Sequence, residues 1–276
     1  MEPLYHYTDL NAFLSIIQSK KLWLTGAYNL NDHQEITWTL GKIWRRLEEL
    51  SKEHGPERSD KIWALLQANS GVPHICSLSS EPDLLSQWRA YGQNGAGIAI
   101  GFKRSALPSS SRLPIMTIAS KDSLSLHQVI YSQKDQDEII NEILLPIFKN
   151  GKIDDSAHFA MSMASSALSG LSSMFKNEAF HEEKEWRIIH RPIIMGPPNS
   201  NESKIQQSIS PPKYRVSGGK LITYFEYDFS GAVGIDIFSE LILGPKCEVS
   251  HYDLSILLTE NGLGNLSVKR SKASYR

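Results

Sequence analysis

The sequence contains few cysteines and no excess of charge of either sign. Only Cys76 and Cys247 occur among 276 residues. Two cysteines are too few for a disulfide framework, so we expect a reducing compartment, the cytoplasm. The 29 Lys and Arg residues nearly balance the 30 Asp and Glu residues. This balance excludes a protein that coats nucleic acid by bulk charge, although the stretch VKRSKASYR, residues 268–276, is locally basic.

The sequence also lacks a long apolar run. No charged segment followed by apolar residues stands at the start, so a leader peptide is not expected. The stretch closest to a membrane span is SAHFAMSMASSALSGLSSMF, residues 156–175, which has no Lys, Arg, Asp or Glu. Its seven serines disfavour a lipid environment. We therefore expect a helix packed inside the protein, and no membrane partner.

Hydrophobic spacing divides the rest of the chain into helices and strands. Thr8 or Asp9 is placed to cap a first helix, because the apolar residues that follow recur at helical spacing. Further helices are predicted at 29–50, 60–69, 81–92, 134–148, 156–175 and 251–263. Strands are predicted at 21–25, 73–80, 95–102, 112–120, 128–131, 185–194, 220–229, 239–245 and 266–271.

The order of these elements predicts the fold class. Helices and strands do not alternate regularly enough for a doubly wound parallel sheet, so we expect an α+β fold with mostly antiparallel strands. Residues 1–276 are expected to form a single domain, in which residues 103–180 are a partly helical insertion. Residues 197–220 are rich in Pro, Ser, Asn and Gly and are predicted to be a long surface loop.

One set of candidate functional residues is the acidic stretch HEEKEWRII. These glutamates stand at the mouth of a predicted strand, where Glu183 and Glu185 point to the same face because side chains alternate along a strand. Two like charges on one face are tolerated if both are solvated or if a cleft raises the pKa of one. Glu182 and Glu183 equally fit a solvated strand entrance, whereas Glu185 adjoins Trp186 and opens an apolar run.

Two more sets lie earlier in the chain. His6 and Thr8 share a face if their segment is extended, which gives a pair of hydrogen-bonding groups before the first helix. A lone histidine at such a place is more often structural. Trp88 and Tyr91, just before Gly92, are either core anchors or a wall for a flat ring. Ser77 and Ser79 are expected to face the same cleft, and Asn31 is expected beside it. Asp32, the next residue, stands three residues before Glu35, which is the spacing of a helix capping box.

Metal and cysteine chemistry have little support. His74 with Cys76, and Cys247 with His251, lack the repeated spacing of a structural zinc site, so no metal is expected. GQNGAG is not followed by Lys and Ser or Thr, which excludes a Walker-type phosphate loop.

Six motifs together resemble domain of unknown function family 2971. They are LYHYTDLNAFLSIIQSKKLWLT, NLND, SLSSEPDLLSQWRAYGQNGAGIAIGF, EEKEWRII, LILGP and VKRSKASYR. Their order and approximate spacing agree with the family over nearly the whole chain.

YHYT before a helix also resembles, more distantly, the opening of the ADP-ribosyltransferase fold. In that superfamily His-x-Thr holds the ribose and amide side of NAD, an aromatic ring stacks on nicotinamide, and a later glutamate at a strand start orients the ribose or the nucleophile. The resemblance implies a split β-sandwich, NAD as substrate, and His6 with Thr8, Tyr91 or Trp88, and Glu185 with Glu183 in these roles. The fold is common among toxins and defence proteins.

Three functions remain open on sequence alone. The first is an ADP-ribosyltransferase-like enzyme that transfers ADP-ribose from NAD to a protein or nucleic acid, or hydrolyses NAD. The second is a non-catalytic nucleotide or nucleic-acid binding module that uses the basic C-terminus and the Trp-rich early helices. The third is a nuclease in which Glu183, Glu185 and His6 act with a divalent metal.

Overall fold

The computed structural model describes residues 2–29, 33–68, 72–109, 112–114, 123–149, 154–195, 204–231 and 234–273. Its helices are α1 Leu10–Ser19, α2 His33–His54, α3 Pro56–Ala68, α4 Leu85–Ala90, α5 Gln133–Lys149, α6 Asp155–Leu171 and α7 His251–Glu260. Its strands are β1 Leu4–Thr8, β2 Lys21–Gly26, β3 His74–Ser79, β4 Ile98–Phe102, β5 Leu124–Gln128, β6 Glu185–His190, β7 Ile193–Met195, β8 Lys204–Gln207, β9 Lys213–Ser217, β10 Lys220–Asp228, β11 Phe238–Leu243 and β12 Ser267–Arg270.

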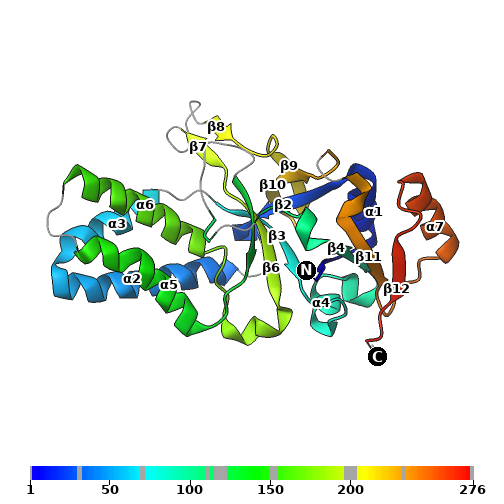
Figure 1. Ribbon diagram of the computed structural model, residues 1–276, viewed down its shortest axis with the longest axis horizontal. Helices are drawn as coiled ribbons and strands as arrows, with labels where there is room; N and C mark the ends of the chain where they lie inside the picture. The colour runs from blue at the N-terminus through cyan, green and yellow to red at the C-terminus, as the bar shows by residue number, and fades with distance from the viewer. Residues whose placement is uncertain are drawn as a thin grey trace.

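A ten-stranded sheet forms the centre of the molecule (Figure 1). Its main path runs β12-β11-β4-β1-β3-β2-β10-β9, and β6 branches from β3 to carry β5. Among the described strands, β11 and β12 form a parallel pair and the other pairs are antiparallel. The α+β class and the mostly antiparallel sheet predicted from the sequence are therefore confirmed.

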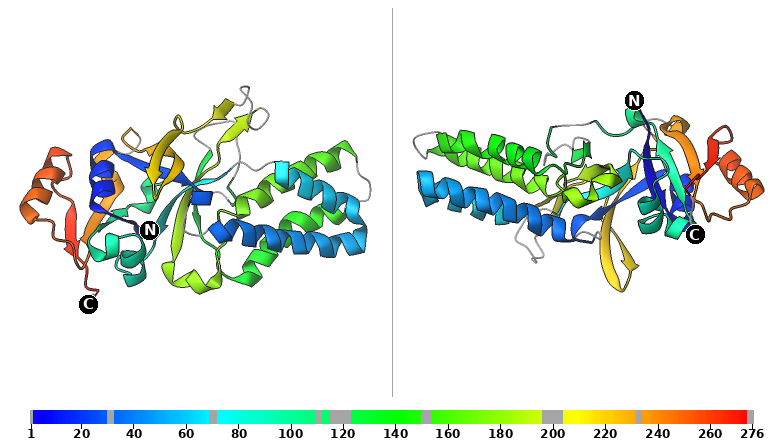
Figure 2. Two further views of the ribbon diagram at one scale, coloured as in Figure 1. Left: turned by 180° about the vertical axis from the view of Figure 1, so that it is seen from behind. Right: turned by 90° about the horizontal axis from the view of Figure 1, so that it is seen from below.

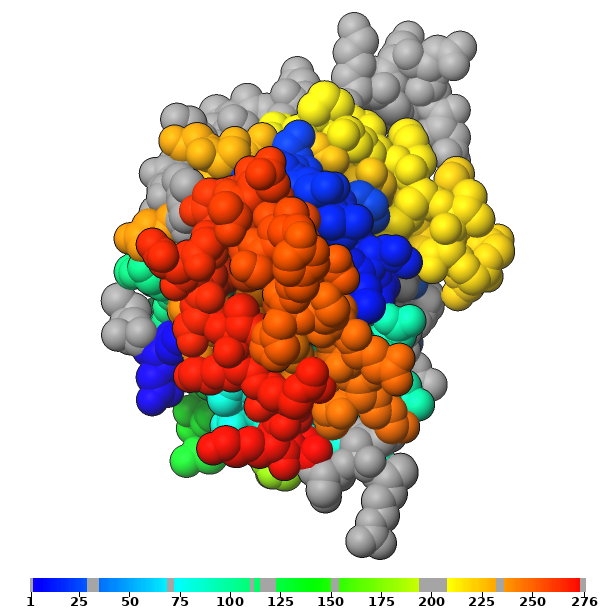
Figure 3. Space-filling model, turned by 90° about the vertical axis from the view of Figure 1, so that its right-hand side faces the viewer, coloured from blue at the N-terminus to red at the C-terminus, as the bar shows by residue number. Residues whose placement is uncertain are grey.

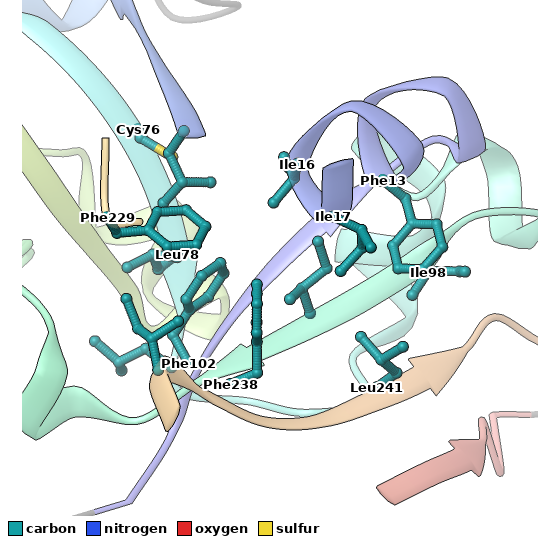
Figure 4. Packing of buried hydrophobic residues seen from close by; sticks show 14 of the residues in the cluster. Phe13, Ile16, Ile17, Cys76, Leu78, Ile98, Phe102, Phe229, Phe238 and Leu241 are labelled. Carbon is teal, nitrogen blue, oxygen red and sulfur yellow. The ribbon is translucent and has the colours of Figure 1, made fainter. Parts of the chain in front are cut away.

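The main core lies between α1 and the sheet. Asp9 caps α1 by accepting a hydrogen bond from the Ala12 amide at 2.8 Å, as its position before the helix predicts. Phe13 and Ile17 then point from α1 toward the strands that carry Ile98 and Leu241 (Figure 4). The same core extends toward α7, which with β12 covers one end of the molecule (Figure 3).

A second core lies within a group of four helices at the other end (Figures 1 and 2). The helices of the expected insertion, α5 and α6, pack there beside α2 and α3, which come from before β3. The serine-rich stretch forms α6 as predicted, with Met161 and Leu168 completely buried. Within the described part of the chain, no helix has both the length and the apolar character that a membrane crossing needs.

Two strand predictions from the sequence need correction. The strand expected at 128–131 lies earlier, at β5, and Ile130 makes only an isolated bridge with Phe175. The expected surface loop at 197–220 contains β8 and β9, because strand pairing with β7 and β10 overrides its turn-like composition. Residues 115–120 of another predicted strand, together with Asn31 and Asp32, lie outside the described residues.

Gly97 fixes the approach of β4 to the end of β1. A Cβ at this position would lie 2.1 Å from the Thr8 carbonyl oxygen, which is backbone and cannot rotate away. We expect Gly97→Ala to lower the free energy of unfolding by about 1–3 kcal/mol, the usual cost of overpacking. Gly41→Ala is the matched control, because a Cβ there meets nothing within 4 Å and Ala favours the helix by about 1 kcal/mol. Urea denaturation measures both, and equal stability of the two variants would contradict this packing.

Candidate functional site

A cavity opens where β1 and β2 separate along one edge of β3. β1 pairs with β3 through Tyr5 and Ser79, whereas β2 pairs with it through Thr25 and Ile75. The stretch of β3 between these pairs borders a cavity of about 270 Å³. The cavity is lined by residues from distant parts of the sequence, among them His6, Thr8, Trp23, Ser77, Tyr91 and Arg215.

His6 of β1 contacts the backbone of β3 between these two pairs. Its Nδ1 lies 2.9 Å from the Ser77 carbonyl oxygen, and because that oxygen can only accept, Nδ1 carries the proton. Burial lowers the pKa of His6, although the Ser77 carbonyl and Asp9 act against the shift, so the ring is neutral at pH 7. Nε2 of this tautomer is then an acceptor for a ligand hydroxyl or amide. His6, the histidine between two tyrosines, thus satisfies a backbone carbonyl of β3 and lines the cavity.

The other residues predicted for the cleft divide into two groups. Thr8, Ser77 and Tyr91 line the cavity as expected. Trp88 does not, because it is fully buried on the opposite side of β1, edge-on to Tyr7 at 4.7 Å between ring centroids. Its role as a core anchor replaces the predicted stacking role.

Ser79 and Glu183 also differ from the prediction. Ser79 is 1% exposed and its hydroxyl donates to the Glu183 carbonyl oxygen at 2.7 Å, so it stabilises a turn instead of facing the cavity. Glu183 lies in a 3₁₀ helix before β6 and not on the strand. Asn31 falls outside the described residues.

Glu185 belongs to a buried cluster of charges. Arg187 donates to both carboxylate oxygens of Glu185, from Nε at 2.8 Å and from Nη2 at 2.9 Å. Lys176 Nζ lies 3.2 Å from Glu185 and 2.7 Å from Glu183. Glu35 of α2 completes the cluster, 2.9 Å from Arg187 and 3.4 Å from Lys176. The two cations therefore remove the like-charge repulsion that the sequence suggested between the glutamates.

The pKa values of Glu185 and Glu35 are shifted in opposite directions within the cluster. Burial by itself would raise the pKa of Glu185, but Arg187 and Lys176 outweigh it and hold the pKa at about 2. Burial raises the pKa of Glu35 to about 7, against the same two cations. Glu185 is consequently an ionised carboxylate at neutral pH, whereas Glu35 is partly protonated there.

Ser77 connects this cluster to the cavity. It lines the cavity, and its hydroxyl also lies near enough to the Glu185 carboxylate to help lower the pKa of that group. Glu185 itself is 5% exposed and does not line the cavity wall. The arrangement places a fixed negative charge directly behind the hydroxyl of Ser77.

The sequence did not indicate several of these residues. Trp23 carried only a strand pattern, Arg215 fell in the predicted loop, and Lys176 followed the serine-rich helix. A larger hollow of about 430 Å³ lies between α2 and α5. Its lining is charged side chains of both signs without an aromatic ring, so the smaller cavity is the better candidate.

Comparison of the chain with curated proteins and with solved structures finds no match. A family model, described as "Protein of unknown function (DUF2971)", matches residues 87–188. This segment begins within α4, just before Trp88, contains β4, β5, α5 and α6, and ends within β6 after Glu185 and Arg187. Over residues 87–188 the chain is therefore similar to the DUF2971 family, which its sequence motifs resemble.

Proposed function

We propose that the cavity between β1 and β3 binds NAD and that the protein is an ADP-ribosyltransferase-like enzyme. The observation that carries the proposal is the convergence of His6, Thr8 and Tyr91 on one cavity, with Glu185 one hydroxyl behind it. These are the residue types that the resemblance assigns to ribose, nicotinamide and the reacting centre. The acceptor of ADP-ribose would be a protein, a nucleic acid or water.

The chemistry of the cavity suits cleavage of the nicotinamide glycosidic bond. That reaction passes through an oxocarbenium-like state, which a nearby carboxylate stabilises. Glu185 is ionised at pH 7 and held by Arg187, so its charge is preorganised. Neutral His6 would accept a hydrogen bond from the ribose, and Tyr91 would stack on nicotinamide.

The separation of β1 and β2 along β3 also supports the finer fold proposal. A sheet that splits beside a histidine-bearing first strand is what the ADP-ribosyltransferase resemblance implies. In this proposal the split forms the nucleotide cleft, and the helical group α2, α3, α5 and α6 is an elaboration on the split β core.

A non-catalytic nucleotide-binding module is the second candidate. The observation in its favour is that Glu185 is buried and bound to Arg187 and Lys176, which leaves the carboxylate behind the cavity wall. The nuclease alternative gains nothing from the cluster, because the two cations stand between the carboxylates where a metal would be needed.

Titration calorimetry with NAD tests the proposed site. We expect one NAD per chain and about 10-fold weaker binding in Tyr91→Ala, since a stacked ring contributes about 0.5–1.5 kcal/mol beyond its buried area. Tyr214→Ala is the matched control, because Tyr214 is exposed on β9 and does not line the cavity. Equal losses in the two variants, or no heat with the wild type, would overturn the proposal.

A further inference from the structure

Arg215 is a cation that lines the cavity. It lies on β9, opposite Ile222 of β10, and among the described residues no carboxylate forms an ion pair with it. Its Nε is buried and has no hydrogen-bond partner there. A guanidinium kept partly from water without a counter-charge is costly, which indicates that a ligand supplies the charge.

The guanidinium is held in position by its neighbours. It stacks over Trp23 with 5.6 Å between its central carbon and the ring centroid, and Nη2 donates to the Thr25 hydroxyl at 3.4 Å. Trp23 is itself fixed by Tyr224, at 4.5 Å between ring centroids. Such a planar fork matches the oxygens of a phosphate.

Two lysines near Arg215 have a carboxylate partner. Lys213, two positions earlier on β9, lies 2.9 Å from Glu226, and Lys21 of β2 lies 3.1 Å from the same carboxylate. Glu226 is therefore shared by two lysines. Arg215 instead lines the cavity, together with His6 and Thr8.

We infer that Arg215, stacked on Trp23, forms a phosphate subsite of the cavity. The ligand class is then a phosphorylated nucleotide whose ring and ribose lie near Tyr91 and His6 and whose phosphate contacts Arg215. This assignment of the ligand rests on the proposed function, whereas the anion subsite rests on Arg215 alone.

The test is titration calorimetry of the wild type, Arg215→Met and Lys213→Met with NAD, nicotinamide riboside and inorganic pyrophosphate. Arg215→Met is expected to weaken NAD and pyrophosphate binding by about 10-fold to 100-fold, because a charged hydrogen bond is lost. Nicotinamide riboside, which has no phosphate, should change by less than about 3-fold. Lys213→Met removes the same charge two residues away and should leave NAD binding within about 2-fold.

Circular dichroism checks folding, and Arg215→Lys serves if Arg215→Met does not fold. Lysine keeps the charge without the fork, so an intermediate loss of NAD affinity is expected. NAD binding unchanged in either Arg215 variant would overturn the subsite and leave the proposed function standing. Pyrophosphate binding that depends on Arg215, with no binding of NAD, would retain the subsite and overturn the proposed function. Binding of neither ligand by the wild type would overturn both.

Discussion

Replacing Arg187 by Met should lower the free energy of unfolding by about 3–5 kcal/mol, the usual cost of leaving a buried charge without its partner. Arg187 is 2% exposed and binds Glu185, Glu35 and the Ser173 carbonyl oxygen. Methionine fills part of the volume but donates no hydrogen bond. Glu185 would keep Lys176 as its remaining cation, and Glu35 would lose its closest one.

Arg45→Met is the matched control for this substitution. Arg45 is exposed on α2 and donates to the Gly41 carbonyl oxygen of its own helix, at 3.3 Å. Its replacement should change stability by no more than about 0.5 kcal/mol. Urea denaturation at pH 7 measures both variants. A cost below about 1 kcal/mol for Arg187→Met would mean that the charges of this cluster are not buried as described.

Glu185→Gln should reduce NAD turnover by about 10²–10³-fold, the common effect of removing one preorganised electrostatic group. Glutamine retains the size and part of the hydrogen bonding of glutamate. It removes the negative charge that would stabilise the oxocarbenium-like centre from behind Ser77, which lines the cavity. The measurement is the initial rate of NAD consumption, with a cell lysate as the source of acceptor.

Glu182→Gln is the control, because Glu182 is exposed, as the sequence predicts. Glu185 is buried and bound to Arg187 and Lys176, so a stability cost of about 1.5–3 kcal/mol is expected. The rates of NAD consumption must therefore be compared at a temperature at which circular dichroism shows both variants to be folded. Unchanged turnover in Glu185→Gln would remove Glu185 from catalysis, and a wild type that consumes no NAD would favour the binding module.

Local signals in the sequence account for much of the fold. The spacing after Asp9 predicts α1 and its cap, and the glycine-bounded apolar run predicts β4. His6 and Thr8 could be placed on one strand beside that helix because alternation in an extended segment is a local property. The exposure of Glu182 before β6 was predictable because a charged side chain without a partner favours solvent.

Contacts between distant residues account for what the sequence left out. Glu35 lies 152 positions from Arg187, so nothing near Glu185 revealed that α2 supplies a further carboxylate to this cluster. β9 forms because β10 pairs with it, although Pro, Ser and Gly surround it, and this concealed Arg215. Trp88 was ambiguous because an aromatic residue before a turn fits a core and a pocket equally well, and packing against Tyr7 decides the matter.

A crystal structure of the Glu185→Gln variant with NAD would test the central claim most directly, because the slow variant would preserve the ligand. The account predicts nicotinamide in the cavity between β1 and β3, in contact with Tyr91 and His6, and phosphate at Arg215. NAD bound elsewhere, as in the hollow between α2 and α5, or an empty cavity at saturating NAD, would contradict it.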